Sequence, residues 1–434
     1  MSTTARVILW GNLIGAVTWD DSRGVGVFQY ASDFLPSGIQ LSPLMMPLSG
    51  IPYEFPALPP ITFRGLPGLL SDSLPDKFGN AIIDAWLASH GRSIESFNSV
   101  ERLCYVGNRG MGGLEFEPAL LAPYSGTNAI EVADLVDLSN RILDQRTELN
   151  GIFNGKDDHE AIENILRVGT SAGGARAKAI LAWNPKTNEF RSGQIPSSLG
   201  FEYWIMKFDG ISSNRDKELT DPQGYGKIEY AYSLMAGEAG ISMAPCRLHH
   251  EGGRSHFMTK RFDRTDEGKK LHMQSLCAIA HIDYNQAGIY SYEQALNVMK
   301  RMQLSSKDLE QQVLRAMFNV VGRNQDDHVK NIAFLMTPEG EWILSPAFDV
   351  TYAYSPQGEW TGKHQMILNG KRDQFTRDDL IALAQVGGIK PKKATDMIER
   401  VLYTVNRWPE FAEIAGVDEK IIARVRNGQR LKLE

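Results

Sequence analysis

A short polar segment, residues 324–331, has the residue types and the spacing of a phosphate-transfer site. It reads Asn-Gln-Asp-Asp-His-Val-Lys-Asn, which places Asp326 and Asn331 in the pattern D-x-x-x-x-N. In a kinase catalytic loop with this spacing, the Asp accepts the proton of the attacking hydroxyl and the Asn binds a metal ion that neutralises the phosphates. His328 makes the loop D-x-H-x-x-N, a version also found in phosphoinositide and aminoglycoside kinases. The segment is therefore a candidate catalytic centre.

A second carboxylate follows a predicted β-hairpin. Residues 331–336 and 341–344 have the pattern of two short strands around a Thr-Pro-Glu-Gly turn, and Asp349 comes directly after them. Because a hairpin returns its two ends to the same place, we expect Asp349 to meet Asn331 and to complete a Mg²⁺ site. A polar loop with this spacing by chance is the alternative. The predicted helix before the loop, the hairpin after it and Asp349 at its end favour the catalytic interpretation.

Two segments earlier in the chain could hold phosphates. Residues 169–178 read Gly-Thr-Ser-Ala-Gly-Gly-Ala-Arg-Ala-Lys, and glycines let backbone N–H groups approach phosphate oxygens. No Gly-Lys-Ser/Thr follows, so this is not a Walker A sequence, and a glycine-rich turn is the alternative. Lys207 lies inside the apolar run 204–208, where burial is costly without an anionic partner. A kinase places its phosphate-binding lysine on such a strand.

The elements around these segments follow the order of a kinase. Hydrophobic patterns predict a β-meander over 5–30, proline- and glycine-rich loops over 40–68, helical structure over 71–102 and a helix over 130–146. Strand-like runs at 179–183, 203–208 and 256–259 surround a helix over 228–239. After residue 262 the chain is mostly helical, with predicted helices at 288–302, 306–321, 377–386, 391–407 and 418–426.

We therefore predict an α+β, protein-kinase-like bilobal fold with an additional N-terminal α/β subdomain. The expected units are an N-terminal subdomain at 1–150, a small β-rich lobe at 151–262 that carries the glycine-rich loop and the strand lysine, and a helical C-terminal lobe at 263–434 that carries the catalytic loop and the metal site.

The composition narrows the class of protein. The 434 residues are 42% apolar and 23% charged, as in ordinary globular proteins. Only three cysteines occur, without metal-ligand spacing, which argues against a disulfide framework or a zinc site. The net charge of −6 weighs against a dedicated nucleic-acid-binding protein. With no signal-peptide pattern and no apolar run of about 20 residues, we expect a cytoplasmic protein that does not span a membrane.

Taken in order, several motifs resemble the HipA family of bacterial serine/threonine-kinase toxins over most of the chain. The matching segments are 63–70, 72–76, 173–178, 260–264, 274–277 and 327–331. The resemblance implies that Asp326 is the catalytic base and that Asn331 and Asp349 hold Mg²⁺. It also implies an ATP site made from the glycine-rich loop, the strand lysine, a hinge that receives adenine and two residues of the catalytic loop: Gly173, Gly174, Ala175, Arg176, Lys178, Lys207, Lys260, Arg261, Phe262, His328 and Lys330.

The same resemblance implies a regulatory site and partners. Ser171 matches the serine that such kinases autophosphorylate, and a phosphate there would eject the loop from the nucleotide site. One departure is Arg176-Ala177-Lys178, where the best-known form of the family has an acidic–basic pair. The implied partners are a HipB-like helix-turn-helix antitoxin dimer, operator DNA bound through that complex in co-repression, and a translation-related protein substrate such as an aminoacyl-tRNA synthetase.

Two other functions remain open from the sequence. A small-molecule kinase of the aminoglycoside or choline type shares the D-x-H-x-x-N loop. A catalytically silent co-repressor subunit would only rigidify a DNA-bound antitoxin. The presence of Asp326, Asn331, Asp349 and Lys207 together argues against the silent subunit, because a structural role does not require all four.

Overall fold

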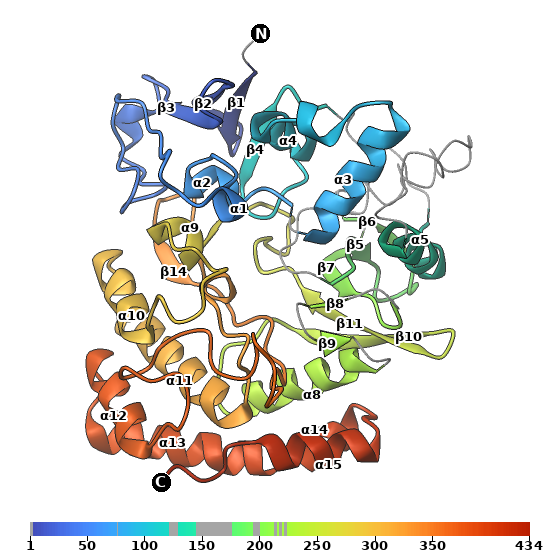
Figure 1. Cartoon of the computed structure of the whole chain (residues 1–434), viewed down its shortest axis with the longest axis vertical. Helices are drawn as coiled ribbons and strands as arrows, with labels where there is room; N and C mark the ends of the chain where they lie inside the picture. Colours follow the sequence, from blue (N-terminus) through green and yellow to red (C-terminus); the bar gives the residue numbers. More distant parts are fainter. Residues whose placement is uncertain are drawn as a thin grey trace.

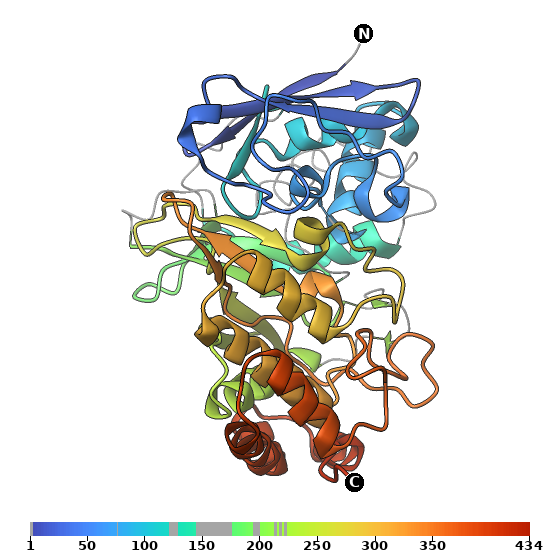
Figure 2. The same ribbon diagram turned by 90° about the vertical axis from the view of Figure 1, so that its left-hand side faces the viewer.

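The computed structural model describes residues 3–75, 77–120, 129–144, 176–193, 200–211, 215–216, 219–220 and 224–434. The chain forms an N-terminal unit, a small β-rich lobe and a helical lobe. The N-terminal sheet (blue) lies at one end of the longest axis of the molecule, and the last helices of the chain (red) lie at the other end (Figures 1 and 2). This confirms the predicted α+β, kinase-like fold with an N-terminal subdomain. The described residues contain no helix with both the length and the apolar character needed to cross a bilayer.

The N-terminal unit is built on an antiparallel sheet with the strand order β3-β2-β1-β4. The predicted meander forms β1 (Thr4–Leu9), β2 (Asn12–Asp20) and β3 (Val25–Tyr30), and β4 (Leu114–Glu117) joins the edge of β1. Trp10 and Gly11 have φ angles of 50° and 78°, so they form the tight two-residue turn that matches strand twist.

The helices of this unit lie beside and below the sheet. Short α1 (Pro60–Phe63) and α2 (Gly68–Ser71) precede α3 (Lys77–Ser89), α4 (Ser99–Val106) and α5 (Val132–Asp144), and single 3₁₀ turns occur at Leu35–Ser37 and Ile94–Ser96. The helical stretch predicted over 71–102 is thus divided. Asn98 begins α4 with a capping box to Glu101, which fixes the new start.

The small lobe is a five-stranded antiparallel sheet with the order β10-β11-β7-β5-β6. Its strands are β5 (Lys178–Trp183), β6 (Phe190–Ser192), β7 (Glu202–Lys207), β10 (Cys246–Glu251) and β11 (Arg254–Lys260). A separate ribbon joins β8 (Arg215–Asp216) to β9 (Leu219–Thr220). Helix α8 (Tyr225–Glu238) packs along β10 and β11 (Figure 1).

Alternation along β7 separates the two faces of this sheet. Trp204 and Met206 belong to an apolar cluster that also contains Phe78 of α3 and Val136 of α5. Lys207 is one residue further on and therefore faces the other side, toward α8. The N-terminal unit thus supplies the apolar cover for one face, and the opposite face is left for polar groups.

The helical lobe contains α9 (Leu276–Ala280), α10 (Tyr292–Arg301), α11 (Ser306–Gly322), α12 (Arg377–Val386), α13 (Pro391–Asn406), α14 (Trp408–Ile414) and α15 (Glu419–Gly428). Ser305 and Asp308 form a capping box at the start of α11, and Pro391 occupies the first turn of α13. The predicted hairpin is β13 (Ala333–Met336) and β14 (Trp342–Leu344), and β12 (His272–Ser275) adds a third strand.

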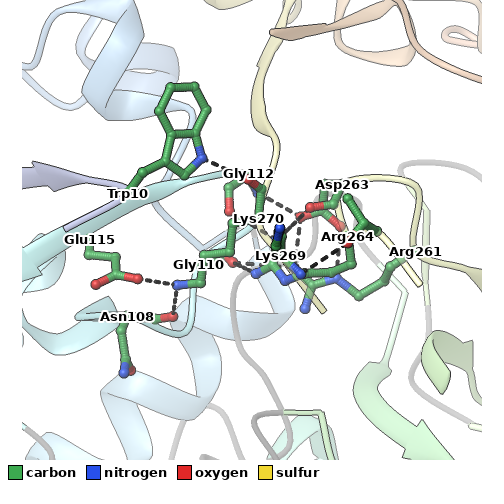
Figure 3. Close-up of polar contacts among 11 residues, drawn as sticks. Trp10, Asn108, Gly110, Gly112, Glu115, Arg261, Asp263, Arg264, Lys269 and Lys270 are labelled. Atoms are coloured by element: carbon green, nitrogen blue, oxygen red, sulfur yellow. Dashed lines mark hydrogen bonds and ion pairs between the residues drawn. The ribbon is translucent and has the colours of Figure 1, made fainter. Parts of the chain in front are cut away.

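Polar contacts attach the N-terminal unit to the segment that follows β11 (Figure 3). Asp263 is fully buried and accepts hydrogen bonds from Arg261, from Arg264 and from the backbone N–H of Gly112 at 2.7 Å. Both arginines also donate to the carbonyl oxygen of Gly110. A buried ion cluster therefore fixes the loop of the N-terminal unit against the connection between the two lobes.

The N-terminal unit also contacts the helical lobe directly. The carboxylate of Asp72 accepts hydrogen bonds from the backbone N–H and the hydroxyl of Ser275, at 2.7 and 2.9 Å. The backbone N–H of Gly68 donates to Nε2 of His281 at 3.0 Å. Since Phe63 lies in the apolar core of the helical lobe, this unit holds both lobes and limits how far they can move apart.

Candidate active site

The candidate catalytic loop begins where α11 ends. Arg323 has a left-handed backbone with φ 58° and stops the helix, and the loop then runs to a 3₁₀ turn at Val329–Asn331. Asp327 is buried and accepts hydrogen bonds from the Tyr292 hydroxyl, Nδ1 of His364 and the backbone N–H of Gln365 at 2.7, 2.8 and 2.7 Å.

Burial alone would raise the pKa of Asp327, but His364 and these hydrogen bonds outweigh it and hold the pKa below its usual value. Asp327 is therefore an ionised anchor in the interior. Its neighbour Asp326 is left at the rim, where the side chain is 23% exposed. The two adjacent carboxylates are thus divided between holding the loop and facing the site.

Trp360, His328 and Asn331 are among the residues that contact Asp326. Its Oδ1 accepts a hydrogen bond from Nε1 of Trp360 at 2.6 Å, and Nε2 of His328 lies 3.8 Å from the same oxygen. The side-chain amide of Asn331 donates to the backbone carbonyl oxygen of Asp326 at 2.9 Å. That bond fixes the orientation of Asn331 and leaves its amide oxygen as the atom suited to a cation.

Lys207 finds the anionic partners that its burial requires. Its Nζ lies 2.6 Å from Oε1 of Glu229 on α8 and 2.5 Å from Oδ1 of Asp349. Burial alone would lower the pKa of Lys207, but Asp349 and Glu229 outweigh it and raise the pKa above its usual value. Burial likewise opposes ionisation of Asp349, yet Lys207 and Lys178 hold its pKa below the usual range. Lys207 and Asp349 are therefore both charged near neutral pH.

The backbone at Asp349 is unusual for a residue with a side chain. Its φ of 53° lies in the left-handed region, so the chain turns sharply after β14. Such conformations cost free energy and persist where surrounding contacts hold them. Here the ion pair with Lys207 is one such contact. The turn brings the carboxylate to the lysine rather than leaving it along the hairpin axis.

Two further cations gather around this centre. The guanidinium of Arg176 stacks on the Tyr225 ring at 3.5 Å, and its Nη1 lies 3.7 Å from Oε2 of Glu229. Lys178 is buried on β5, directly opposite Lys207 in the strand register. Among the described residues, three cationic side chains thus gather around the carboxylates of Glu229 and Asp349. Clustered lysine and arginine side chains suit an anionic ligand such as a polyphosphate.

The predicted hinge residues lie at the end of β11 and directly after it, between the two lobes. The side chain of Lys260 pairs with Glu202 and Asp266, and the guanidinium of Arg261 is taken up by Asp263. The backbone N–H groups of both residues are also bonded, to Pro245 and Tyr203. The ring of Phe262 lies 5.6 Å from that of Phe348, next to Asp349. Both cationic side chains are thus paired with neighbouring carboxylates.

Other predicted residues fall into two groups. Nζ of Lys330 lies 5.1 Å from the ring centre of Tyr284, and that ring is 5.4 Å from His328, so these side chains form the rim beside Asp326. The predicted residues Ser171, Gly173, Gly174 and Ala175 lie outside the described residues.

The residues present fit a metal ion held together with a nucleotide. In the part of the chain that the structure describes, no three His, Cys, Asp or Glu side chains form a metal site by themselves. Asn331 borders one small cavity with Phe348 and Val350, the two neighbours of Asp349. An amide oxygen and a carboxylate oxygen are hard donors that suit Mg²⁺, whose remaining positions take water and phosphate oxygens.

Sequence reasoning missed Glu229 and Trp360. Glu229 lies four residues after Tyr225 and three residues before Tyr232, on the buried face of α8, and it is only 2% exposed. A carboxylate in an apolar helical stripe is a signal that could have found it. Trp360 comes from a loop without periodicity, and no local pattern marks it.

Comparisons with known proteins agree over most of the length. The HipA N-terminal domain family matches residues 5–117, and the HipA-like C-terminal domain family matches residues 170–408. No curated protein sequence matches the chain. A solved structure of the Shewanella oneidensis MR-1 toxin–antitoxin complex of HipA, HipB and operator DNA has a chain with the same fold, at 19% identity and a TM-score of 0.66, covering 98% of this chain and 95% of that one.

A second solved structure, the Helicobacter pylori proinflammatory kinase CtkA, matches at 12% identity and a TM-score of 0.32, over 52% of this chain and 90% of that one. The family match to residues 170–408 alone spans more than half of the 434 residues and includes the catalytic loop, Lys207 and Asp349. The chain belongs to the HipA family of serine/threonine-protein kinase toxins.

Proposed function

We propose that this chain is the toxin of a HipBA-type pair and transfers the γ-phosphate of Mg-ATP to a serine of a translation-related protein. The observation that carries this proposal is the Lys207–Glu229–Asp349 cluster beside the loop of Asp326 and Asn331. A lysine held by a helix glutamate and a metal-binding aspartate are the parts that protein kinases require for phosphoryl transfer.

Each residue has a definite part in this proposal. Glu229 holds Lys207 against the α- and β-phosphates, and Asn331 with Asp349 holds Mg²⁺. Bound Mg-ATP supplies the phosphoryl group and the charge of the metal. Asp326 accepts the proton of the serine hydroxyl. At the same time the serine oxygen forms its bond to the γ-phosphorus, and ADP leaves.

The remaining predicted residues line the nucleotide. Arg176 and Lys178, together with Gly173, Gly174 and Ala175, would surround the phosphates, and His328 and Lys330 would flank the acceptor side. At the hinge, Arg261 is bound to Asp263 and Lys260 to Glu202 and Asp266. Because the backbone N–H groups of these two hinge residues are already bonded to Pro245 and Tyr203, the two residues would meet adenine through their carbonyl oxygens, and Phe262 would meet it through its ring or backbone.

Regulation by Ser171 belongs to the same proposal. Arg176 and Lys178 follow this serine closely in the chain and lie in the cationic cluster. A phosphate on Ser171 would compete with ATP for those cations and would withdraw the glycine-rich loop from the nucleotide. Autophosphorylation would then inactivate the enzyme.

A partner is also proposed. Membership of the HipA family and the fold shared with a chain of the HipA–HipB–operator complex support a HipB-like helix-turn-helix antitoxin dimer, with operator DNA bound through it. An aminoacyl-tRNA synthetase is the proposed class of target, since arrest of translation by one phosphate would explain toxicity.

The first experiment is the intact mass of purified protein before and after incubation with Mg-ATP, beside Asp326→Ala. We expect the gain of one phosphate on Ser171, absent in Asp326→Ala. If unmodified protein binds ATP but gains no phosphate, autophosphorylation is wrong. Transfer to small alcohols instead of lysate proteins would identify a small-molecule kinase, and transfer to neither would identify a silent co-repressor.

A further inference from the structure

The segment between Asp349 and α12 returns to the catalytic loop. On one side of the return, the backbones of Gln325 and Ala353 are hydrogen bonded at 3.1 Å. On the other side, His364 and Gln365 both bond to the carboxylate of the anchor Asp327. A loop fixed at both ends to the catalytic segment leaves little freedom for what lies between, and Trp360 lies there.

Trp360 contacts the proposed catalytic base directly. Its indole Nε1 donates to Oδ1 of Asp326 at 2.6 Å, and its ring centre lies 6.5 Å from that of His328. The side-chain amide of Gln365 donates to the backbone carbonyl of Trp360. Gln365, which helps to anchor Asp327, therefore also holds the backbone of Trp360. The segment that contains Trp360 and Gln365 thus contacts the carboxylates of both Asp326 and Asp327.

We propose that Trp360 is a positioning residue for phosphoryl transfer: its indole N–H holds the carboxylate of Asp326 in the orientation that receives the serine proton, and its ring forms one wall of the acceptor site. The inference rests on the proposed function, because it assigns Asp326 the role of base. An aspartate side chain has two rotatable bonds, so a donor fixed on its carboxylate restricts the orientation of that carboxylate.

The chemistry of the indole suits this part. An indole N–H is a donor only, so it binds the carboxylate without competing for the proton that Asp326 must accept. Lysine would instead add a full charge next to the base, and histidine could take the proton itself. A rigid aromatic ring also fixes the donor with few rotatable bonds. The orientation of Asp326 is therefore set before substrate arrives, which is the condition for efficient general-base catalysis.

The decisive variant is Trp360→Phe, which keeps the ring and removes the donor. The matched control is Trp342→Phe, since Nε1 of Trp342 donates to the carbonyl oxygen of Gln40 at 3.1 Å in the N-terminal interface, away from Asp326. Four proteins are compared: Trp360→Phe, Trp342→Phe, Asp326→Ala and the unaltered chain. For each, the initial rate of ADP release is measured with Mg-ATP and dephosphorylated casein, and the Kd of ATP is measured by calorimetry.

We expect kcat of Trp360→Phe to fall by about tenfold or more, since a hydrogen bond to a charged group is lost, while the Kd of ATP changes by less than about twofold. Trp342→Phe should keep its kcat. If the unaltered chain is active and Trp360→Phe has an equal kcat, the inference is wrong but the proposed function stands. A higher kcat in Trp360→Phe would also overturn the inference and would identify Trp360 as an obstacle to the substrate. An unaltered chain no faster than Asp326→Ala would overturn the proposed function and the inference together.

Discussion

Oε1 of Glu229 lies 2.6 Å from Nζ of Lys207, so helix α8 and strand β7 meet through one charged contact in the interior of the small lobe. The same Nζ is 2.5 Å from Asp349 in the helical lobe. The position of α8 is therefore linked to both Lys207 and Asp349. Any shift of α8 would change the proposed phosphate site.

The first prediction concerns this contact. Glu229→Gln removes the charge that holds Lys207, and we expect the Kd of ATP to rise by about tenfold and kcat to fall by at least as much. Calorimetry and phosphate-transfer rates measure the two effects. Glu238→Gln, at the other end of the same helix, removes only a surface pair with Arg407 and should change neither. Unchanged ATP binding and turnover in Glu229→Gln would show that the pair is dispensable.

The second prediction concerns the buried cluster of Figure 3. Asp263→Asn leaves Arg261 and Arg264 buried without their carboxylate, and we expect unfolding in urea to become easier by about 3–5 kcal/mol at pH 7. Asp266→Asn is the control: its side chain is 85% exposed, and its pair with Lys260 should contribute less than about 1 kcal/mol. A loss no larger than that of the control would mean that the cluster contributes little stability.

The stability contribution of Asp263 also depends on pH. Burial alone would raise the pKa of Asp263, but Arg261 and Arg264 lower it by more, so the folded pKa lies below the unfolded one. The contribution of Asp263 to stability is then complete above about pH 4 and is lost as the pH falls further. When the pH is lowered below about pH 4, the stability of Asp263→Asn should therefore fall less than that of the unaltered chain.

The third prediction tests the close approach of the N-terminal unit to the helical lobe. A Cβ at Gly68 would lie 2.3 Å from the carbonyl oxygen of Ala278 and 2.6 Å from Cδ2 of His281. Gly68→Ala should therefore destabilise the protein by about 1–3 kcal/mol in urea unfolding. Gly237→Ala, at an exposed position of helix α8 with open space around it, should be neutral or stabilising by about 0.5–1 kcal/mol. Equal stabilities for the two variants would contradict the packing.

The fourth prediction is a pH dependence at His281. Burial lowers the pKa of His281 to about 4, and its Nε2 accepts the hydrogen bond from Gly68, so the folded protein holds the neutral ring. Between about pH 6.5 and 4 the unfolded chain binds more protons at this site, and stability falls with falling pH by up to about 1.4 kcal/mol per unit. His281→Gln keeps an acceptor and should lessen this slope. The exposed His90→Gln should leave it unchanged.

Much of the fold followed from local signals. The capping residues Ser305 and Asp308 and the proline at 391 marked helix starts that the structure reproduces. The missed strand β12 has only four residues, and it becomes a strand because β13 offers it an edge. Strand β10 also lies outside the predicted strand-like runs, although it pairs with its neighbour β11 across the short Gly252-Gly253 turn. Strand β12, in contrast, depends on a partner that is distant in the chain.

The candidate site likewise contains residues that local sequence spacing identifies and residues that only tertiary contacts bring in. Asp326 and Asn331 stand on one short loop, so their spacing carried the information. Glu229 contacts Lys207, and Trp360 contacts Asp326, and each pair is joined by tertiary folding rather than by sequence spacing. The contact of Arg261 with the carbonyl oxygen of Gly110 at the domain interface could not be predicted for the same reason.

The apolar core of the N-terminal unit has a consequence for the order in which the protein can form. This core includes Met336 of β13, and Trp342 of β14 packs against it. Although β1, β2 and β3 leave the ribosome first, their core is complete only after residue 342 has been synthesised. The nascent N-terminal sheet therefore waits with an open apolar face, and its closure coincides with the completion of the catalytic segment rather than preceding it.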